Sequence, residues 1–269
     1  MKPYKKTGDK HRGHPQDGRK RPPPKEDPSI FWLYGRHAVA AALANPERRI
    51  RRGLATKNAA DWLRQIGVPP EKLAMMEDAR PNQIDHLLPP GAVHQGIAVE
   101  AHDLERARLK DVCDPAGGRR PVVVLDQITD PQNIGAILRT AAAFGARAAI
   151  VQERRTPPLS GVLAKAAAGA VETLPVVKAV NISRALEALK ELGYHCAGLA
   201  GDAGAPITAL PKDRPIAIVL GAEGAGLRQL VAATCDGLYR IPIDRAMESL
   251  NVSNASAISL FEATRGDIA

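Results

Sequence analysis

Short apolar runs alternate with helix-forming segments from Pro121 onward, and this alternation restricts the possible folds more than any other feature of the sequence. Val122 to Leu125 and Ile216 to Leu220 are continuously apolar, as expected for strands that are buried on both faces. Strands that alternate with helices predict a parallel sheet with helices on both sides. Ligands of such sheets bind beyond the carboxyl ends of the strands, so the polar segments that follow the strands are the candidates for a functional site.

The same patterns give the expected elements of this region. Strands are predicted at Val122–Leu125, Ala148–Val151, Leu174–Val177, Tyr194–Leu199, Ile216–Leu220 and Leu238–Ile241. Helices are predicted at Asn133–Phe144, Leu159–Ala168, Ile182–Leu192 and Leu227–Ala233, and from Ser249 or Asn251 to the region of Arg265.

A smaller alternating α/β domain is expected at 29–102, bounded by strands at Ile30–Tyr34 and Gly96–Glu100. Between them we expect a strand near Ile50–Thr56, a helix near Ala59–Ile66, a strand near Lys72–Met76 and a helix at Pro81–Leu88. Its turns carry polar residues that could contact a nucleotide, namely Arg36, His37, His94 and Gln95. Each histidine taken singly is equally consistent with an ordinary surface residue.

Two further segments complete the organisation of the chain. Residues 1–28 hold nine Lys or Arg against four Asp or Glu, with six prolines, and such a composition predicts a disordered arm. The arm either gathers RNA phosphates electrostatically or serves only to solubilise the protein. Mixed charge followed by Pro-Ala-Gly-Gly marks 103–120 as a linker, which leaves 121–269 as the larger domain.

The length, composition, net charge and cysteine count of the chain exclude several classes of protein. The chain of 269 residues is 45% hydrophobic, enough for a substantial core, and its formal net charge of +8 favours a polyanionic partner. No apolar stretch approaches eighteen residues and the start has no apolar h-region, so neither a membrane span nor a secretory signal is expected. Three widely spaced cysteines without metal-ligand spacing indicate reduced thiols in a cytoplasmic protein.

Asp130 to Arg139 is the first of three polar segments that follow predicted strands. Asn133 and Arg139 are six residues apart and do not share one face of a helix. Asn133 is therefore expected at the helix entrance, with Arg139 reaching from the second turn. An N-cap asparagine and an unrelated surface arginine are the plainer alternative.

The other two segments are Leu220 to Leu227 and Ile241 to Arg265. Glycines in the former permit a tight turn, but the pattern is not G-x-G-x-x-G, which argues against a dinucleotide-binding oxidoreductase. Glu223 within this turn could accept hydrogen bonds from an amide, a guanidinium or a nucleotide, or could simply face solvent. The last segment leads into a helix rich in small residues that either Ser249 or Asn251 could cap.

Together the segments NIGAILRTAAAFGA, IVLGAEGAGL and IPIDRAMESLNVSNASAISLFEA resemble the three motifs of the SpoU/TrmH family of AdoMet-dependent RNA 2′-O-ribose methyltransferases. YGRHAVAAAL and GAVHQGIA are similar to the segments that bound the small RNA-binding domain of bacterial 23S rRNA guanosine 2′-O-methyltransferases. The resemblance implies an L30e-like first domain and a SPOUT-type catalytic domain with a deep trefoil knot, which general connection rules would not predict. It also implies a homodimer whose active site lies near the subunit interface.

The resemblance also assigns the residues of the active site. The methyl transfer that it implies requires no metal. The catalytic positions that it implies are Asn133, Arg139, Glu223, Ser249 and Asn251. The positions that it implies for AdoMet are Gly221, Ile241 and Leu250, with Leu199 as a further candidate for the adenosine pocket.

Methyl transfer to a ribose hydroxyl requires the oxygen to be aligned behind the methyl group and its proton to be removed, so positioning is a large part of the catalysis. The resemblance makes Arg139 the base, with Asn133 and Glu223 orienting it. An ordinary arginine does not deprotonate, so a clamp on phosphate or ribose is an equal alternative.

The predicted function is therefore AdoMet-dependent 2′-O-methylation of RNA, on a guanosine of 23S rRNA that is either free or part of a pre-ribosomal particle. The alternatives are a tRNA 2′-O-methyltransferase and a catalytically silent RNA-binding ribosome assembly factor. The presence of Asn133, Arg139, Glu223 and Asn251 argues against the silent factor.

Overall fold

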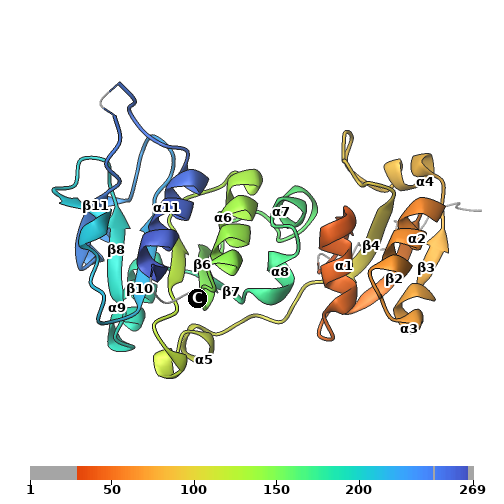
Figure 1. Ribbon diagram of the computed structural model, residues 1–269, viewed down its shortest axis with the longest axis horizontal. Coiled ribbons are helices and arrows are strands. Elements are labelled where there is room, and N and C mark those ends of the chain that lie inside the picture. Colours follow the sequence, from red (N-terminus) through yellow and green to blue (C-terminus); the bar gives the residue numbers. More distant parts are fainter. Residues whose placement is uncertain (1–28, 245, 266–269) are drawn as a thin grey trace, which may run out of the picture.

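The computed structural model describes residues 29–244 and 246–265, which form two domains with separate sheets (Figure 1). The smaller domain has four strands and the larger has seven. The basic arm predicted at 1–28 lies outside the described residues. No helix within the described part of the chain combines the length and the apolar character needed to cross a bilayer.

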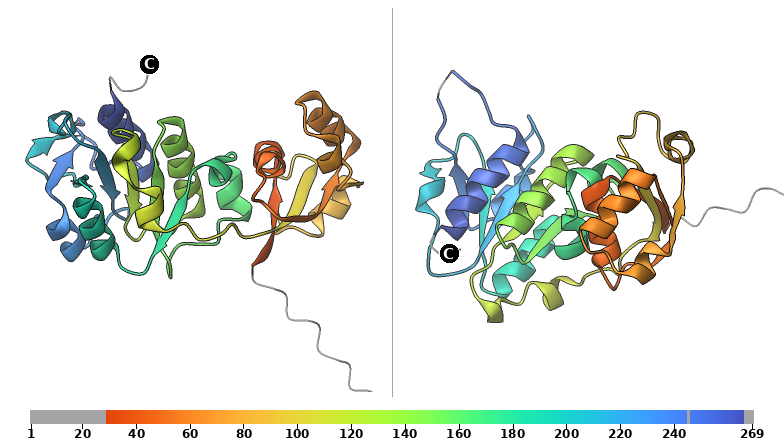
Figure 2. Two further views of the ribbon diagram at one scale, coloured as in Figure 1. Left: turned by 90° about the horizontal axis from the view of Figure 1, so that it is seen from below. Right: turned by 45° about the vertical axis from the view of Figure 1, so that its right-hand side comes forward.

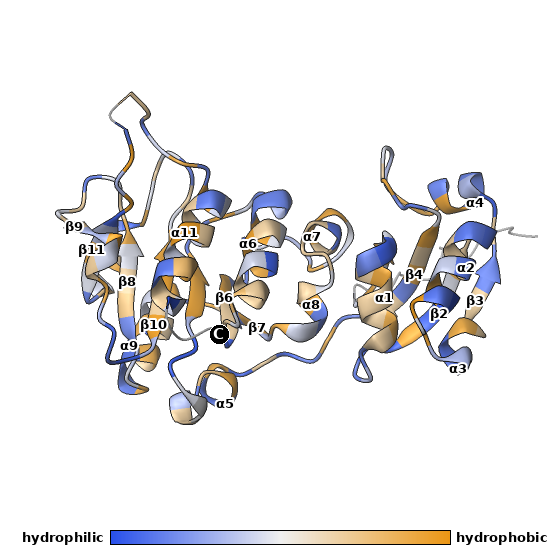
Figure 3. Cartoon of the chain, viewed as in Figure 1, coloured by the Kyte–Doolittle hydropathy of each residue, from blue (hydrophilic) through white to orange (hydrophobic). Residues whose placement is uncertain are grey.

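The sheet of the smaller domain has the order β1-β4-β2-β3, and only its β2–β3 pair is parallel. The central strand β4 is largely hydrophobic in Figure 3, whereas the short edge strand β3 is hydrophilic. Charged residues on an edge strand discourage pairing with other chains. The strands are β1 (Ile30–Tyr34), β2 (Ile50–Ala55), β3 (Met76–Asp78) and β4 (Ile97–His102).

The helices of this domain pack on both sides of the sheet. They are α1 (Arg36–Ala44), α2 (Lys57–Gln65), α3 (Pro70–Leu73) and α4 (Pro81–Asp85). The strand predicted at Lys72–Met76 is wrong, because Pro70 starts a helical turn there and pairing begins only at Met76. The helix predicted to reach Leu88 ends at Asp85.

The sheet of the larger domain has the order β7-β6-β5-β10-β8-β11-β9, and each neighbouring pair of its strands is parallel, as predicted. The two-residue strand β9 was not predicted, since two residues carry no pattern. The strands are β5 (Val122–Leu125), β6 (Ala148–Gln152), β7 (Val176–Ala179), β8 (His195–Leu199), β9 (Ala205–Pro206), β10 (Ile216–Leu220) and β11 (Gly237–Arg240).

Helices cover both faces of this sheet, and each face has its own hydrophobic core. One face carries α6 (Pro131–Ala143), α7 (Gly161–Ala166), α8 (Ala170–Thr173) and α11 (Val252–Thr264). The other carries α5 (Leu109–Val112), α9 (Ile182–Glu191) and α10 (Gln229–Thr234).

The segment predicted as a linker is partly folded onto the larger sheet. It contains α5, and the side chains of Leu109, Val112 and the fully buried Cys113 pack against one of the two cores. Burial raises the pKa of Cys113 to about 11 and the pKa values of Cys196 and Cys235 to about 12. All three thiols are free in the structure, and their raised pKa values disfavour the reactive thiolate.

Candidate active site

The three polar segments meet at one edge of the larger sheet. Strands β5, β10, β8 and β11 are neighbours and run parallel, so the residues that follow their carboxyl ends lie side by side. This edge faces upward in Figure 1, where the segment between β11 and α11 projects from the domain. It is the edge at which ligands of open α/β sheets bind.

A triangle of side-chain hydrogen bonds joins one residue from each polar segment. Asn133 Nδ2 donates to Glu223 Oε1 at 2.9 Å, and Asn251 Nδ2 donates to the same oxygen at 3.2 Å. Asn251 Nδ2 also lies 3.1 Å from Asn133 Oδ1. Hydrogen bonds to a charged carboxylate are stronger than neutral ones, so the triangle ties together loops that are 90 and 118 residues apart in sequence.

Helix ends hold the two asparagines of the triangle in place. Asp130 caps α6 by accepting from the backbone N–H groups of Gln132 and Asn133, so the N-cap role considered for Asn133 belongs to Asp130. Asn251 caps α11, because its Oδ1 accepts from Ser253 N at 2.8 Å and from Ser253 Oγ at 2.6 Å. The Nδ2 group of each asparagine is then free to donate within the triangle.

A glycine turn presents Glu223 to the two asparagines. Ala222 and Gly226 exchange backbone hydrogen bonds of 3.1 and 2.9 Å, which closes the turn. A Cβ atom on Gly221 would lie 2.2 Å from the carbonyl carbon of Gly226, so only glycine fits there. Gly224 and Gly226 both have positive φ, the left-handed region that glycine adopts without strain.

Asp126 anchors this turn to the neighbouring strand and was not identified from the sequence. Its side chain is fully buried and accepts from Arg228 N, Nε and Nη2 at 3.1, 2.9 and 2.6 Å. Its own N–H donates to Leu220 O at 2.8 Å. An acidic residue directly after the apolar run Val122–Leu125 was the available signal, because a buried charge needs a partner.

We expect Asp126→Asn to lower the free energy of unfolding by about 1–3 kcal/mol, because it removes charge-assisted bonds from a buried site. Chemical denaturation would measure this effect. Asp213→Asn is the matched control: Asp213 pairs with its neighbour Arg214 at the surface, and no measurable change is expected. Equal stability of the two variants would contradict the anchoring role of Asp126.

Arg139 and Ser249 stand outside the triangle. Both side chains are exposed, and neither forms a hydrogen bond or ion pair with another described residue. Both asparagines donate to Oε1 of Glu223, and the orientation of Arg139 by Asn133 and Glu223 stays a prediction. Arg139 lies in the second turn of α6 and is free to meet a ligand or a second subunit.

The positions expected to hold AdoMet gather at the same edge. Leu199 ends β8, Gly221 follows β10, Ile241 follows β11 and Leu250 directly precedes the cap of α11. All four residues are half-buried, and Leu199 and Ile241 pack against the core of this face. Aliphatic side chains beside a glycine turn with approachable backbone suit an adenosine, so the residues present fit AdoMet.

The smaller domain brings three of its four candidate RNA residues together. The guanidinium of Arg36 lies 5.3 Å from the ring centre of Trp62, and the His37 ring meets the same tryptophan edge-on at 6.4 Å. Gln95 Oε1 accepts from Arg36 N at 3.0 Å. Trp62 was missed, because a tryptophan within a predicted helix is typical of a core residue. We call Arg36, His37, Trp62 and Gln95 the tryptophan cluster.

His94 has a different role from the one expected. The residue is only 9% exposed, its Nδ1 accepts from Gly96 N at 3.0 Å, and its Nε2 lies 3.1 Å from Asp85 Oδ1. With both ring nitrogens engaged, His94 stabilises the turn before β4 and is poorly placed to contact RNA.

Within residues 29–244 and 246–265, no group of three or more His, Cys, Asp or Glu side chains is arranged to bind a metal ion.

The larger domain has a parallel sheet whose carboxyl edge carries hydrogen-bonded polar residues and a glycine turn, and this is the class of α/β domain in which nucleotide-like ligands bind at that edge. The chain belongs to the SpoU rRNA Methylase family, whose model matches residues 120–261.

Known relatives and structures agree with this assignment. The protein of Vibrio parahaemolyticus named 23S rRNA (guanosine-2'-O-)-methyltransferase RlmB is 36% identical over 245 residues, which are 88% of this chain and 98% of that protein. An uncharacterized tRNA/rRNA methyltransferase of Synechocystis sp. is 37% identical over 91% of this chain, which spans only 66% of that protein. The SpoU methyltransferase AviRb of Streptomyces viridochromogenes, solved with AdoMet, shares the fold with a TM-score of 0.73 at 22% identity, covering 90% of this chain and 91% of its own.

Proposed function

We propose that this protein transfers a methyl group from AdoMet to the ribose 2′-oxygen of a guanosine in 23S rRNA. The observation that carries the proposal is the Asn133–Glu223–Asn251 triangle, which joins the three family motifs at the ligand-binding edge. The names of the relatives that match almost the whole chain support the choice of 23S rRNA and of guanosine.

The residues at this edge have separate roles in the reaction. AdoMet, when bound, supplies an electrophilic methyl group. Gly221, Leu199, Ile241 and Leu250 would hold its adenosine through backbone and apolar contacts, and the triangle joins the segments that carry Gly221 and Leu250. Arg139 contacts the RNA phosphate or ribose. A clamp role fits its exposed position, whereas a role as base would require its enclosure by substrate or a partner subunit.

The finer features of the fold belong to the same proposal. We infer an L30e-like smaller domain and a trefoil knot in the larger one. The inference of the knot rests on the match to the SpoU family over residues 120–261. We also infer action in the cytoplasm, where a 23S rRNA substrate is found.

We further propose that the protein is a homodimer formed through the outer face of α11. Phe261 and Ile258 on this helix are 53% and 40% exposed, and Phe144 at the end of α6 contacts Phe261 edge-on at 6.3 Å. Exposed aromatic and aliphatic side chains that lie together mark interaction surfaces. The same helix pair carries Arg139, so a partner subunit on this face would approach the active site.

The dimer proposal predicts that Phe261→Asp weakens self-association by about 2 kcal/mol or more, roughly 30-fold in Kd, because buried aromatic anchors dominate interfaces. Analytical ultracentrifugation over a range of concentrations would measure it. Leu230→Asp is the control, since Leu230 is 67% exposed but lies on α10, on the opposite face of the sheet. A monomeric wild-type protein, or equal effects of both substitutions, would rule out this interface.

Mapping of 2′-O-methyl groups in the RNA of a strain that lacks the protein tests the proposed substrate. The proposal predicts the loss of one methylated guanosine from 23S rRNA and its return when the gene is restored. Loss from a tRNA instead would establish the tRNA enzyme. An unchanged methylation map would favour a silent assembly factor.

A further inference from the structure

A buried ion pair links the two domains. Arg48 follows α1 of the smaller domain, and Glu172 lies in α8 of the larger domain. Arg48 Nη2 donates to Glu172 Oε1 at 2.7 Å, and Arg48 Nε donates to Glu172 Oε2 at 3.0 Å. The two side chains are 1% and 3% exposed, so this forked contact is shielded from water and from salt.

Neighbouring groups form further hydrogen bonds with the pair. Asn45 Nδ2 donates to Glu172 Oε2 at 2.9 Å, and Arg48 Nη1 donates to the backbone oxygen of His102 at 2.7 Å. The guanidinium also lies 5.7 Å from the ring centre of Phe31. A buried ion pair with several further hydrogen bonds favours one arrangement of its parts, because another arrangement leaves a buried charge unpaired. We call Arg48, Glu172 and Asn45 the joint.

Close packing surrounds the joint on one side. Helices α7 and α8 of the larger domain lie against β1 and α1 of the smaller one, as both views in Figure 2 show. Ala164 of α7 is 2% exposed and belongs to the core of the smaller domain. A Cβ atom on Gly169 would lie 2.7 Å from Cβ of Ala41, so the backbone of this segment must come that close.

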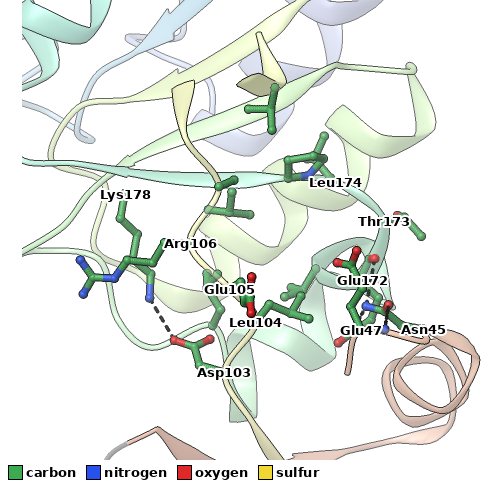
Figure 4. A pocket seen from close by; sticks show the side chains of 16 residues that line it. Asn45, Glu47, Asp103, Leu104, Glu105, Arg106, Glu172, Thr173, Leu174 and Lys178 are labelled. Carbon is green, nitrogen blue, oxygen red and sulfur yellow. Dashed lines mark hydrogen bonds and ion pairs between the residues drawn. The ribbon is translucent and has the colours of Figure 1, made fainter. Parts of the chain in front are cut away.

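A cavity of about 370 Å³ lies on the other side of the joint, between the crossing chain at Asp103–Ala107 and the end of α8. Figure 4 shows Asn45 and Glu172 bonded at one end of it and the Lys178–Asp103 pair at the other. The pairs Lys178–Asp103 and Arg106–Glu153 are partly exposed, and such ion pairs contribute little to stability. The boundary between the domains is therefore open beside the joint, and on this side the buried pair sets the orientation of the domains.

We propose that Arg48 and Glu172 are positioning residues that hold the tryptophan cluster at a fixed distance from the methyl-transfer edge, and that this distance selects the nucleotide that is methylated. The inference rests on the proposed function for the identity of the ligand. RNA is bound at the cluster, and the target ribose is presented at the edge formed by the Asn133–Glu223–Asn251 triangle.

The geometry of α1 carries this proposal. The helix has the tryptophan cluster at its start, at Arg36, and the joint just beyond its end, at Asn45 and Arg48. Its nine residues span about 13 Å at 1.5 Å per residue, so a rotation at the joint becomes a displacement at the cluster. The segment before β4, which contains Gln95, and the segment before α11 project from the same side of the molecule in Figure 1. One RNA can therefore contact both.

Glu172→Gln tests the joint, because it keeps the shape of the side chain and removes its charge. Glu153→Gln is the matched control, since it removes the carboxylate of an exposed pair with Arg106 at the same boundary. Each variant would be assayed for the KM of a 23S rRNA fragment, for kcat, and for the position of every methyl group added. Energy transfer between dyes on the two domains would report the distribution of interdomain distances without RNA.

We expect Glu172→Gln to broaden that distance distribution, to raise the KM for RNA about tenfold with little change in kcat, and to spread methylation to neighbouring nucleotides. AdoMet affinity should stay at the wild-type value, and Glu153→Gln should behave as wild type throughout.

Wild-type distances and a single methylation site in Glu172→Gln would overturn the inference. Should that variant fail to fold, Asn45→Ala, which removes one bond of the joint, must shift the same readouts in the same direction. Absence of methyl transfer by the wild-type protein would overturn the proposed function instead, and the distance measurement would still test the joint.

Discussion

Replacing Arg139 by alanine is expected to abolish methyl transfer and to leave AdoMet affinity unchanged. Arg139 extends from α6, whereas the cofactor positions follow β8, β10 and β11 or precede α11. Loss of a clamp misplaces the ribose, whereas loss of a base typically costs 10² to 10⁴-fold, about 3–5 kcal/mol of barrier, so a loss of about 10²-fold or more is expected for either role. Single-turnover rates with saturating RNA and AdoMet measure it without interference from binding.

Arg139→Lys then distinguishes a role as general base from a role as a clamp on phosphate or ribose. Lysine keeps the positive charge and loses the planar fork that holds two oxygens, so a clamp predicts a partial loss. A base role predicts a near-complete loss or a shifted pH profile. Arg184→Ala, on the exposed side of α9, serves as the control and should retain the wild-type rate. A wild-type rate in Arg139→Ala would show that Arg139 has no part in the reaction.

The second large effect is expected from Gly221→Ala, which should weaken AdoMet binding. The new Cβ atom would meet the backbone of Gly226 and Leu227 at 2.2 to 2.4 Å, and backbone does not move aside as a flexible side chain does. Overpacking of this kind costs about 1–3 kcal/mol, equivalent to roughly 5- to 150-fold in Kd if the turn must reform to bind the cofactor. Calorimetric titration with AdoMet gives the value directly.

A glycine in open space provides the control for this experiment. Gly204 has no atom within 4 Å of a built Cβ and does not have a positive φ, so Gly204→Ala should bind AdoMet as the wild type does. Unchanged affinity in Gly221→Ala would place the cofactor away from the glycine turn.

The strands of the larger domain could be predicted because burial on both faces leaves an unmistakable apolar run. Val122–Leu125 and Ile216–Leu220 are strands with the predicted bounds. The edge strand Met76–Asp78 gave no such signal, since a strand that is exposed on one edge tolerates charged residues. The helical turn at Pro70 was therefore mistaken for part of a strand.

The contacts of the site depend on strand order, which local pattern does not contain. The sequence placed Asn133, Glu223 and Asn251 after strands, but their triangle exists only because β10 lies between β5 and β8 and α11 packs on α6. For the same reason, the sequence allowed an amide as a partner of Glu223 but could not identify Asn133 and Asn251 as the residues that donate it. The burial of His94 followed from the tertiary packing of the turn before β4, which spacing along the chain does not reveal.

The joint between the domains was equally hidden in the sequence. Arg48 stands in a run of charged residues that is typical of a solvated surface, and Glu172 lies in a short helix that was not predicted. Only the approach of α8 to the end of α1 turns two ordinary charges into a buried pair.

Transfer of an isotope-labelled methyl group from AdoMet to 23S rRNA, followed by digestion to nucleosides and mass spectrometry, tests the proposed function most directly. The fragmentation pattern distinguishes a methyl group on the ribose from one on the base. The proposed function predicts labelled 2′-O-methylguanosine, formed by the wild-type protein and absent with Arg139→Ala. Label on a base, or no label in RNA despite measured AdoMet binding, would contradict it.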